Sequence, residues 1–213
     1  MMNFNTNTKR LFFMSDLHIG HENIIRLCKR PFSNASEMDK FILDTIKSTV
    51  NSEDIVFDLG DMFWKKSPEE INLILDCFNG AKIFKCRGNH DEGASDGVKG
   101  RFASLGDILK IGVEHQNEYF PIIMCHYPLV SWQWKSKGAL MISGHCHGNN
   151  DAYYIESKDL IVDVGFDSDI AKRTGKFLLE FQDILGYLKE TRGIPESQKI
   201  IDWIKKDGNL KRI

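Results

Sequence analysis

Short, nearly continuous apolar runs punctuate the first half of the chain, and polar or glycine residues end each of them. The runs at 11–15, 54–59 and 81–86 are typical of strands buried on both faces. Between them, the segments 22–29 and 36–50 carry apolar residues at helical spacing. A third helix is expected to begin at Ser67, because Ser67 can cap it, Pro68 suits its first turn and Glu70 completes a capping box.

The second half of the chain has closer-spaced apolar runs. The runs at 108–113 and 119–125 predict a hairpin, and those at 140–143, 153–156 and 160–164 predict further strands. Two helices are expected at 177–191 and 196–206, separated by Gly193 and Pro195. Strands separated by helices, followed by consecutive strands, predict a layered α/β fold with a mixed sheet or a pair of sheets.

Length and charge narrow the class of protein. A chain of 213 residues suits one domain with a sizeable core, and a formal net charge of −2 argues against an extended nucleic-acid surface. The longest apolar runs are too short to span a membrane, and no secretory signal pattern is expected at the start. Five scattered cysteines without a C-x-x-C pair favour a reducing, cytoplasmic setting over a disulfide scaffold.

Five polar motifs follow the apolar runs. They are Asp16-Leu17-His18, Gly60-Asp61, Gly88-Asn89-His90-Asp91, His126 and Gly144-His145-Cys146-His147. Because the loops at the carboxyl ends of strands converge in α/β sheets, we expect these residues to form one site. The mixture of imidazole, carboxylate and amide groups suits Mn, Fe or Zn.

The spacing of the D-x-H and H-x-H motifs predicts which of their side chains point together. An extended backbone would direct residues i and i+2 to the same side, so Asp16 would point with His18, and His145 with His147. Cys146 would then point away from the site and serve as a small packing residue.

In this order, the five motifs resemble those of the calcineurin-like metallophosphoesterase superfamily. The segment SDLHIGHENIIRLCKRPF further resembles a compact bacterial and phage branch, and the match extends over about 11–166. The resemblance implies an α/β fold in the form of a four-layer αββα sandwich with mixed sheets. It also implies a single domain over 1–213, with a core at about 11–166 and a C-terminal helical region at 167–213 packed on or beside it.

The resemblance implies two divalent metal ions as cofactors. Mn²⁺ is the expected metal, with Fe, Zn, Ni and Mg as alternatives. One ion would be held by Asp16, His18, Asp61 and His147, and the other by Asp61, Asn89, His126 and His145, with Asp61 bridging. A hydroxide bridging the metals would attack the phosphorus, while His90, oriented by Asp91, would assist the leaving group as the catalytic pair. Substrate contacts are expected from Asn89, His90, His21 and Arg87.

The substrate implied is a phosphate ester, with a nucleotide among the candidates, and a phosphodiester is favoured. A phosphomonoesterase acting on a nucleotide or small metabolite, a nuclease and a non-catalytic metal-binding scaffold are the alternatives. No membrane partner is expected, and the sequence leaves the oligomeric state open. Arg26 and Arg30 are expected to be solvated charges, with a phosphate contact from one of them as the alternative. Trp132 and Trp134 are expected to be either a buried pair or a stacking rim.

Overall fold

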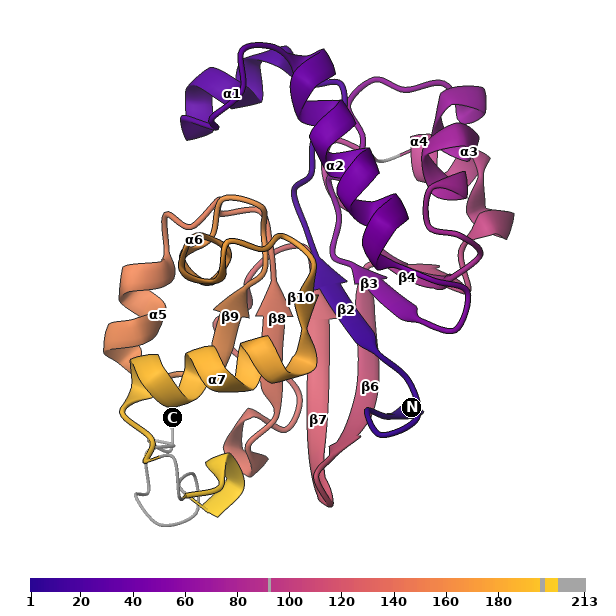
Figure 1. Cartoon of the computed structure of the whole chain (residues 1–213). Coiled ribbons are helices and arrows are strands. Elements are labelled where there is room, and N and C mark those ends of the chain that lie inside the picture. Colours follow the sequence, from indigo (N-terminus) through magenta and orange to yellow (C-terminus); the bar gives the residue numbers. More distant parts are fainter. Residues whose placement is uncertain (92, 196–197, 203–213) are drawn as a thin grey trace.

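Two five-stranded sheets form the centre of the molecule (Figure 1). The computed structural model describes residues 1–91, 93–195 and 198–202. One sheet has the order β10-β2-β3-β4-β5, formed by Leu179–Glu180, Leu11–Met14, Ile55–Asp58, Lys82–Cys86 and Ser104–Gly106. The other has the order β1-β6-β7-β8-β9, formed by Met2–Asn5, Ile108–His115, Glu118–Cys125, Leu140–Ser143 and Ile161–Asp163.

Each sheet mixes parallel and antiparallel pairs. In the first sheet β10 runs antiparallel to β2, and the other three pairs are parallel. In the second sheet β6 and β7 form the predicted hairpin, while β1, β8 and β9 join through parallel pairs. The predicted mixed sheets are therefore confirmed.

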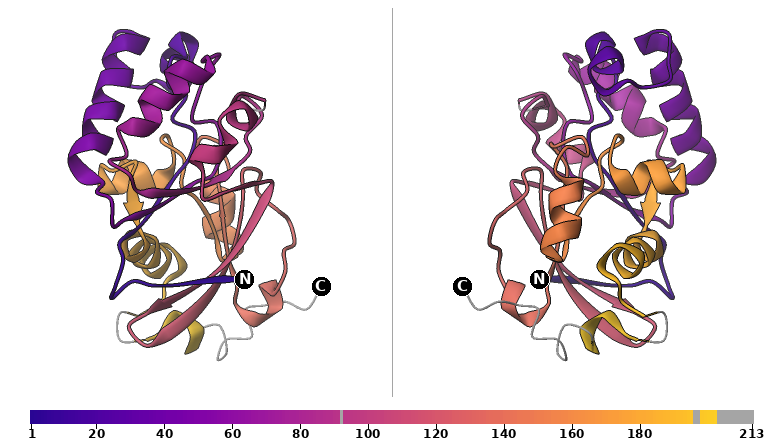
Figure 2. Two further views of the ribbon diagram at one scale, coloured as in Figure 1. Left: turned by 90° about the vertical axis from the view of Figure 1, so that its right-hand side faces the viewer. Right: turned by 90° about the vertical axis from the view of Figure 1, so that its left-hand side faces the viewer.

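Helices cover the outer face of each sheet, and the helix at Phe181–Arg192 packs against the core between the sheets (Figures 1 and 2). The described helices are α1 (Glu22–Cys28), α2 (Ala35–Thr49), α3 (Pro68–Asp76), α4 (Ala94–Gly97), α5 (Asp151–Ser157), α6 (Asp169–Thr174) and α7 (Phe181–Arg192), with short 3₁₀ turns at Lys99–Arg101 and Lys135–Lys137. The side chain of Asn34 caps α2, and Ser67 and Glu70 form the predicted capping box of α3. The buried residues of α2, Met38, Ile42 and Ile46, lie four apart and so share one face.

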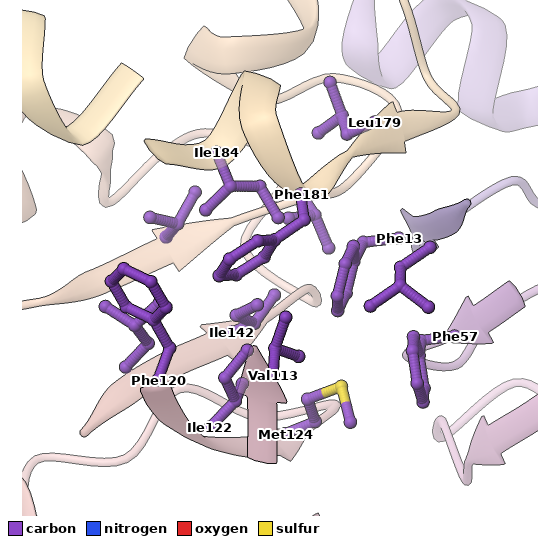
Figure 3. Close-up of a cluster of buried hydrophobic side chains, with 14 of the residues drawn as sticks. Phe13, Phe57, Val113, Phe120, Ile122, Met124, Ile142, Leu179, Phe181 and Ile184 are labelled. Carbon is purple, nitrogen blue, oxygen red and sulfur yellow. The ribbon is translucent and has the colours of Figure 1, made fainter. Parts of the chain in front are cut away.

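Strand β2 shows how the layers are joined. Its residues alternate: Leu11 and Phe13 belong to the core between the two sheets, whereas Phe12 packs in the core beneath the helices. Figure 3 shows the inter-sheet core, where Phe13 and Phe57 of one sheet face Ile122 and neighbouring side chains of the other. Residues of α7 fill the same core. The predicted αββα arrangement is confirmed.

Two predictions for the second half of the chain need correction, and a third falls partly outside the described residues. Residues 153–156 belong to helix α5, because Asp151 and Tyr154 are buried three residues apart, which is a helical spacing. The predicted helix at 177–191 begins later, at Phe181, because Leu179 pairs with Phe13 as strand β10. Residues 196–197 and 203–206 of the predicted last helix lie outside the described residues.

The sheets extend beyond the range expected for the core. Strand β1 precedes residue 11 and pairs with β6, and β10 follows residue 166 and pairs with β2. Over the described ranges, no helix has the length and apolar character that crossing a membrane requires.

Candidate metal centre

The predicted ligands lie where strands of both sheets end. Asp16 and His18 follow β2, Asp61 follows β3, and Asn89 follows β4, and these three strands run parallel to one another. His126, His145 and His147 follow β7 and β8, which are parallel in the second sheet. The loops therefore approach one another from the two sheets at one end of the sandwich.

A first group of ligand atoms surrounds the carboxylate of Asp16. Asp16 Oδ1 lies 4.0 Å from His18 Nε2 and 3.9 Å from His147 Nε2. His18 Nε2 in turn lies 3.9 Å from Asp61 Oδ2. A metal bound at about 2.0–2.2 Å holds its ligand atoms about 3–4 Å apart, so this spacing suits one ion.

A second group shares Asp61 with the first. His126 Nε2 lies 3.4 Å from Asp61 Oδ2 and 3.2 Å from Asn89 Oδ1. The ring of His145 packs against that of His126, with centroids 5.1 Å apart. Asp61 Oδ2 thus belongs to both groups, which is the geometry that a bridging carboxylate requires.

Several buried polar atoms of these residues have no hydrogen-bond partner. Asp16 Oδ1 and both ring nitrogens of His18 are buried and unpaired. Buried polar groups are nearly always satisfied, because leaving them unpaired costs free energy. A divalent cation between Asp16 Oδ1 and His18 Nε2 would satisfy both atoms, so the residues present fit a metal.

The electrostatics of the two groups also favour a cation. Burial and the nearby Asp163 carboxylate raise the pKa of Asp16. A positive charge close to Asp16 would therefore stabilise its ionised form. Burial lowers the pKa of His18 to about 3, which keeps its imidazole neutral and able to bind metal. Burial opposes the charge of Asp61, but interactions with His126 outweigh it and hold the pKa of Asp61 at about 2.

Other side chains orient the histidines. His147 Nδ1 lies 2.8 Å from Asp167 Oδ2, and His126 Nδ1 lies 2.8 Å from the carbonyl oxygen of Leu59. Each contact leaves Nε2 directed toward the ligand groups, an arrangement that metal-binding histidines commonly show. Asp167 lies outside the five motifs, and its position just beyond the 160–164 strand is the one sequence signal that points to it.

Arg30 completes this support, and the expectation that it is solvated is wrong. Its side chain is buried, donates to Asp167 Oδ2 at 2.7 Å and donates to the carbonyl oxygens of Asp16 and Leu17. Its charge is compensated by Asp167, which explains how a guanidinium is accommodated in the interior. Arg30 therefore ties the loop after β2 to Asp167 and, through it, to His147.

The backbone of the ligand loops is not extended, so the reasoning from D-x-H and H-x-H spacing is wrong. Five of the predicted ligands have left-handed backbone angles: Asp16 (φ 57°), His18 (φ 55°), Asp61 (φ 55°), His145 (φ 69°) and His147 (φ 49°). Such conformations cost on the order of 1–3 kcal/mol each for residues other than glycine. Tertiary contacts hold them, including the hydrogen bond from His18 N to the carbonyl oxygen of Asp61.

Glycine is required at two positions because the loops approach so closely. A Cβ on Gly88 would lie 2.1 Å from Asp61 Oδ1, and one on Gly144 would lie 2.4 Å from Asp16 Oδ2. Both glycines therefore allow neighbouring loops to pack directly onto the carboxylates of the predicted ligands. Cys146 is half-buried beside Gly144, and its Sγ accepts a hydrogen bond from Asn150 Nδ2 at 3.1 Å.

His90 lies at the exposed edge of the site, but Asp91 does not orient it. The backbone N–H of His90 donates to Asp61 Oδ1 at 2.8 Å, and its ring lies 5.3 Å from that of His18. The buried carboxylate of Asp91 instead accepts from the backbone of Met62 and Gly88 and pairs with Lys85. The expected hydrogen bond between Asp91 and the His90 ring is therefore not formed.

Arg87 and His21 are the other residues expected to contact substrate, and they lie in different surroundings. Arg87 forms ion pairs with Asp96 at 2.8 Å and Asp107 at 3.3 Å, so its charge is already compensated. His21 is buried against the ring of Trp64 near His18. Trp132 is buried and donates to the carbonyl oxygen of Ala139, as expected for a packing residue.

Comparison with known proteins agrees with the motif order and the fold. A family model described as calcineurin-like phosphoesterase matches residues 9–207. The chain belongs to the calcineurin-like phosphoesterases. This phosphoesterase is 32% identical over 143 residues to an uncharacterized protein, MJ1445, of Methanocaldococcus jannaschii, covering 67% of this chain and 72% of the relative.

A solved structure has the same fold. The protein of unknown function AQ665 from Aquifex aeolicus superposes with a TM-score of 0.63 at 22% identity, covering 84% of this chain and 99% of that one. Membership of the family makes this phosphoesterase a metal-dependent hydrolase of phosphate esters. Within the described part of the chain, Asp16 with His18 and His147, and Asp16 with Asp61 and His126, are groups that could hold such metals.

The contact between Asp167 and His147 leads to a prediction for this phosphoesterase. Burial opposes a charge on His147, but its hydrogen bonds with Asp167 and Cys28 outweigh burial and raise its pKa to about 10. A metal must displace that proton, so we expect Mn²⁺ affinity to rise from pH 6 to pH 8 with proton release. Asp167→Asn should flatten this dependence and weaken binding about 10–100-fold at the higher pH, because His147 loses its orienting partner.

Calorimetry in buffers of different ionisation enthalpy measures both the affinity and the protons released. Asp169→Asn, two residues away on α6, is the matched control, because Asp169 pairs with Arg173 rather than with a predicted ligand. An Asp167→Asn variant with wild-type affinity and proton release would show that Asp167 does not support the centre.

Proposed function

We propose that the protein hydrolyses phosphodiesters at a centre of two divalent metal ions. The observation that carries the proposal is the position of Asp61 Oδ2, 3.9 Å from His18 Nε2 and 3.4 Å from His126 Nε2. Asp16, His18 and His147 would complete one metal site with Asp61, and Asn89, His126 and His145 would complete the other. Mn²⁺ is the proposed metal, because imidazole, carboxylate and amide ligands together suit it.

The charges of the ligands suit an anionic substrate. Two divalent ions bring four positive charges, Asp16 and Asp61 return two negative charges, and the amide and imidazole ligands are neutral. When bound, such a metal pair polarises the phosphoryl group and lowers the pKa of water to supply a nucleophile near neutral pH. The exposed side chains of Asn89, His90 and His145 lie on the solvent side of the buried Asp16, Asp61 and His126, so the substrate would approach there.

His90 has the position to assist the leaving group. Its backbone is held by Asp61, while its ring lies at the exposed edge of the centre. The leaving group of a diester departs as an alkoxide or phenoxide. A positioned imidazole that donates a proton to this oxygen makes its departure easier. We assign that donation to His90 and the phosphate contact to Asn89.

A diester is favoured over a monoester because Arg87 and Arg30, which lie beside the predicted ligands, are already paired with carboxylates. Arg87, expected from the sequence to contact phosphate, is paired with Asp96 and Asp107. Arg30 is buried behind His147 and paired with Asp167. A diester carries one negative charge where a monoester carries up to two, so the diester needs less compensation from the protein.

The substrate class can be tested with purified protein and Mn²⁺. We expect bis-p-nitrophenyl phosphate to be hydrolysed with a kcat/KM at least about tenfold above that of p-nitrophenyl phosphate. Equal or reversed preference would favour the phosphomonoesterase alternative. If no turnover occurs with Mn²⁺, Fe²⁺, Ni²⁺, Zn²⁺ or Mg²⁺, hydrolysis is refuted and the metal-binding scaffold is supported.

A second panel would separate the candidate diesters. Cyclic nucleotides, linear dinucleotides and single-stranded DNA differ in size and would be compared with nucleotide monoesters under the same conditions. The proposal favours the small diesters, and turnover of DNA alone would support the nuclease alternative. The described cysteines are all free, so we also propose a reducing, cytoplasmic location.

A further inference from the structure

Trp64 lies beside His90, outside the five motifs that carry the predicted ligands. It follows Asp61 by three residues, and its backbone N–H donates to the carbonyl oxygen of Ile19 at 3.0 Å. The rings of Trp64 and His90 meet in an edge-type contact, with 4.7 Å between their centroids and an angle of 61° between their planes. Such edge-to-face contacts between rings are favourable and directional.

Among the described residues, the ring of His90 has few other contacts. Its other ring neighbours in the described structure, His18 and His21, lie farther away, at 5.3 and 6.3 Å. Asp91 cannot hold it, because that carboxylate is bonded to Lys85 and to the backbone of Met62 and Gly88. Trp64 therefore provides the closest ring contact that sets the orientation of His90.

The ring of His21 packs against that of Trp64. The two rings are stacked at 3.8 Å with an angle of 8° between their planes. His21 is 8% exposed, its Nδ1 is buried without a hydrogen-bond partner, and the Trp64 ring lies nearer to it than the rings of His18 and His90. A backbone bridge between Ile19 and Phe63 joins the loops that carry His21 and Trp64, which fixes the pair relative to each other.

We propose that Trp64, backed by His21, is the positioning residue for His90. The inference rests on the proposed function, in which His90 assists the leaving group. In that step the oxygen of water forms the new P–O bond, and the leaving oxygen keeps the electron pair of the broken P–O bond. A ring nitrogen of His90 gives its proton to that oxygen, and His90 is reprotonated from solvent, which receives the proton lost by water. Trp64 holds the imidazole at the angle that this transfer needs.

The loss of kcat on removal of the Trp64 ring should depend on the leaving group of the substrate. A p-nitrophenoxide leaves readily and gains little from a proton, whereas a phenoxide is more basic and gains more. Trp64→Ala should therefore lower kcat for diphenyl phosphate about 10–100-fold, but lower kcat for bis-p-nitrophenyl phosphate by no more than about threefold. KM and bound Mn²⁺ should stay close to wild type, and Trp64→Phe, which keeps an aromatic edge, should recover most of the loss.

The double variant provides the sharper test. If Trp64 acts through His90, then Trp64→Ala should cause no further loss in a His90→Ala background. Losses that multiply in the double variant would overturn the inference, and so would an equal loss for both diesters. His21→Ala should show the same leaving-group dependence with a smaller effect, which provides a second test should Trp64→Ala fail to fold.

Two controls separate the failure of this inference from other failures. Trp134→Ala removes a half-buried tryptophan that packs near Ile123 and Trp132, and it should show no leaving-group dependence. Wild-type protein that hydrolyses neither diester would refute the proposed function itself. Active wild-type protein with an unaffected Trp64→Ala variant would refute the role of Trp64 alone.

Discussion

Asp61→Ala is expected to leave the protein with neither metal and to lower phosphodiester turnover at least about 10³-fold. Asp61 Oδ2 is the atom common to the two ligand groups, at 3.9 Å from His18 Nε2 and 3.4 Å from His126 Nε2. Its other oxygen, Oδ1, accepts from the backbone N–H of His90. Alanine would therefore remove one ligand from each proposed metal site and also release the loop that carries Asn89 and His90.

Metal analysis of the protein after loading with Mn²⁺ and desalting measures this effect directly. Asp107→Ala is the matched control, because that carboxylate is exposed and paired with Arg87. The control should keep two metals per chain. An Asp61→Ala protein that retains one metal would show that Asp61 serves a single site, and one that retains two would refute its place in the centre.

Lys85→Met is expected to destabilise the fold by about 3–5 kcal/mol, because it leaves buried carboxylates without their cation. Lys85 is fully buried and pairs with both Asp58 and Asp91. Asp91 also accepts from Met62 N and Gly88 N, so the pair anchors the loops that carry Asp61 and Asn89. For a chain of this size the expected loss corresponds to a fall in Tm of about 6–20 °C.

The pH dependence of the Lys85→Met variant has a definite sign. Burial already raises the pKa of Asp58 with Lys85 present, and loss of the lysine charge raises it further. A carboxyl group with a raised pKa in the folded state favours folding at low pH and loses that contribution as pH rises through its folded pKa. The variant should therefore recover part of its stability near pH 5 relative to pH 8.

Urea unfolding at the two pH values tests this prediction. Lys82→Met, an exposed lysine on the same strand, is the control and should change stability little. Asp58→Asn in the Lys85→Met background should restore part of the loss, because one of the buried charges is removed. An unfolding midpoint for Lys85→Met equal to that of wild type would contradict the role of this ion cluster.

Much of the site could be predicted from the sequence because its residues follow strands with a strong apolar signal. The apolar runs before Asp16, Asp61 and His126 are nearly continuous, so the position of each polar group at a strand end could be predicted. The structure brings these predicted ligands to one end of the sandwich.

The backbone conformation at the ligands could not be predicted in this way. Spacing alone favoured extended segments, whereas Asp16 and His18 are held in left-handed conformations by hydrogen bonds to Gly60 and Asp61. These contacts join residues more than forty positions apart, as the bond from Asp16 N to Gly60 O illustrates, so no local pattern contains them.

The supporting residues were missed for the same reason. Arg30 meets Asp167 across 137 positions of sequence, and Trp64 meets His90 through the packing of two loops. An isolated arginine or tryptophan carries no signal for such a partner. Helix α5 could not be predicted because a segment as short as 153–156 fits both the alternation of a strand and the spacing of a helix. Only the burial of Asp151 and Tyr154 separates the two.

The origin of the ligands in two different sheets has a consequence for the whole molecule. Asp16, His18, Asp61 and Asn89 come from loops of one sheet, whereas His126, His145 and His147 come from loops of the other. Each metal would take ligands from both, so it would act as a cross-link that fastens the two halves of the sandwich at one end. Part of the free energy of metal binding then becomes free energy of folding, and resistance to heat becomes a function of the metal concentration around the protein.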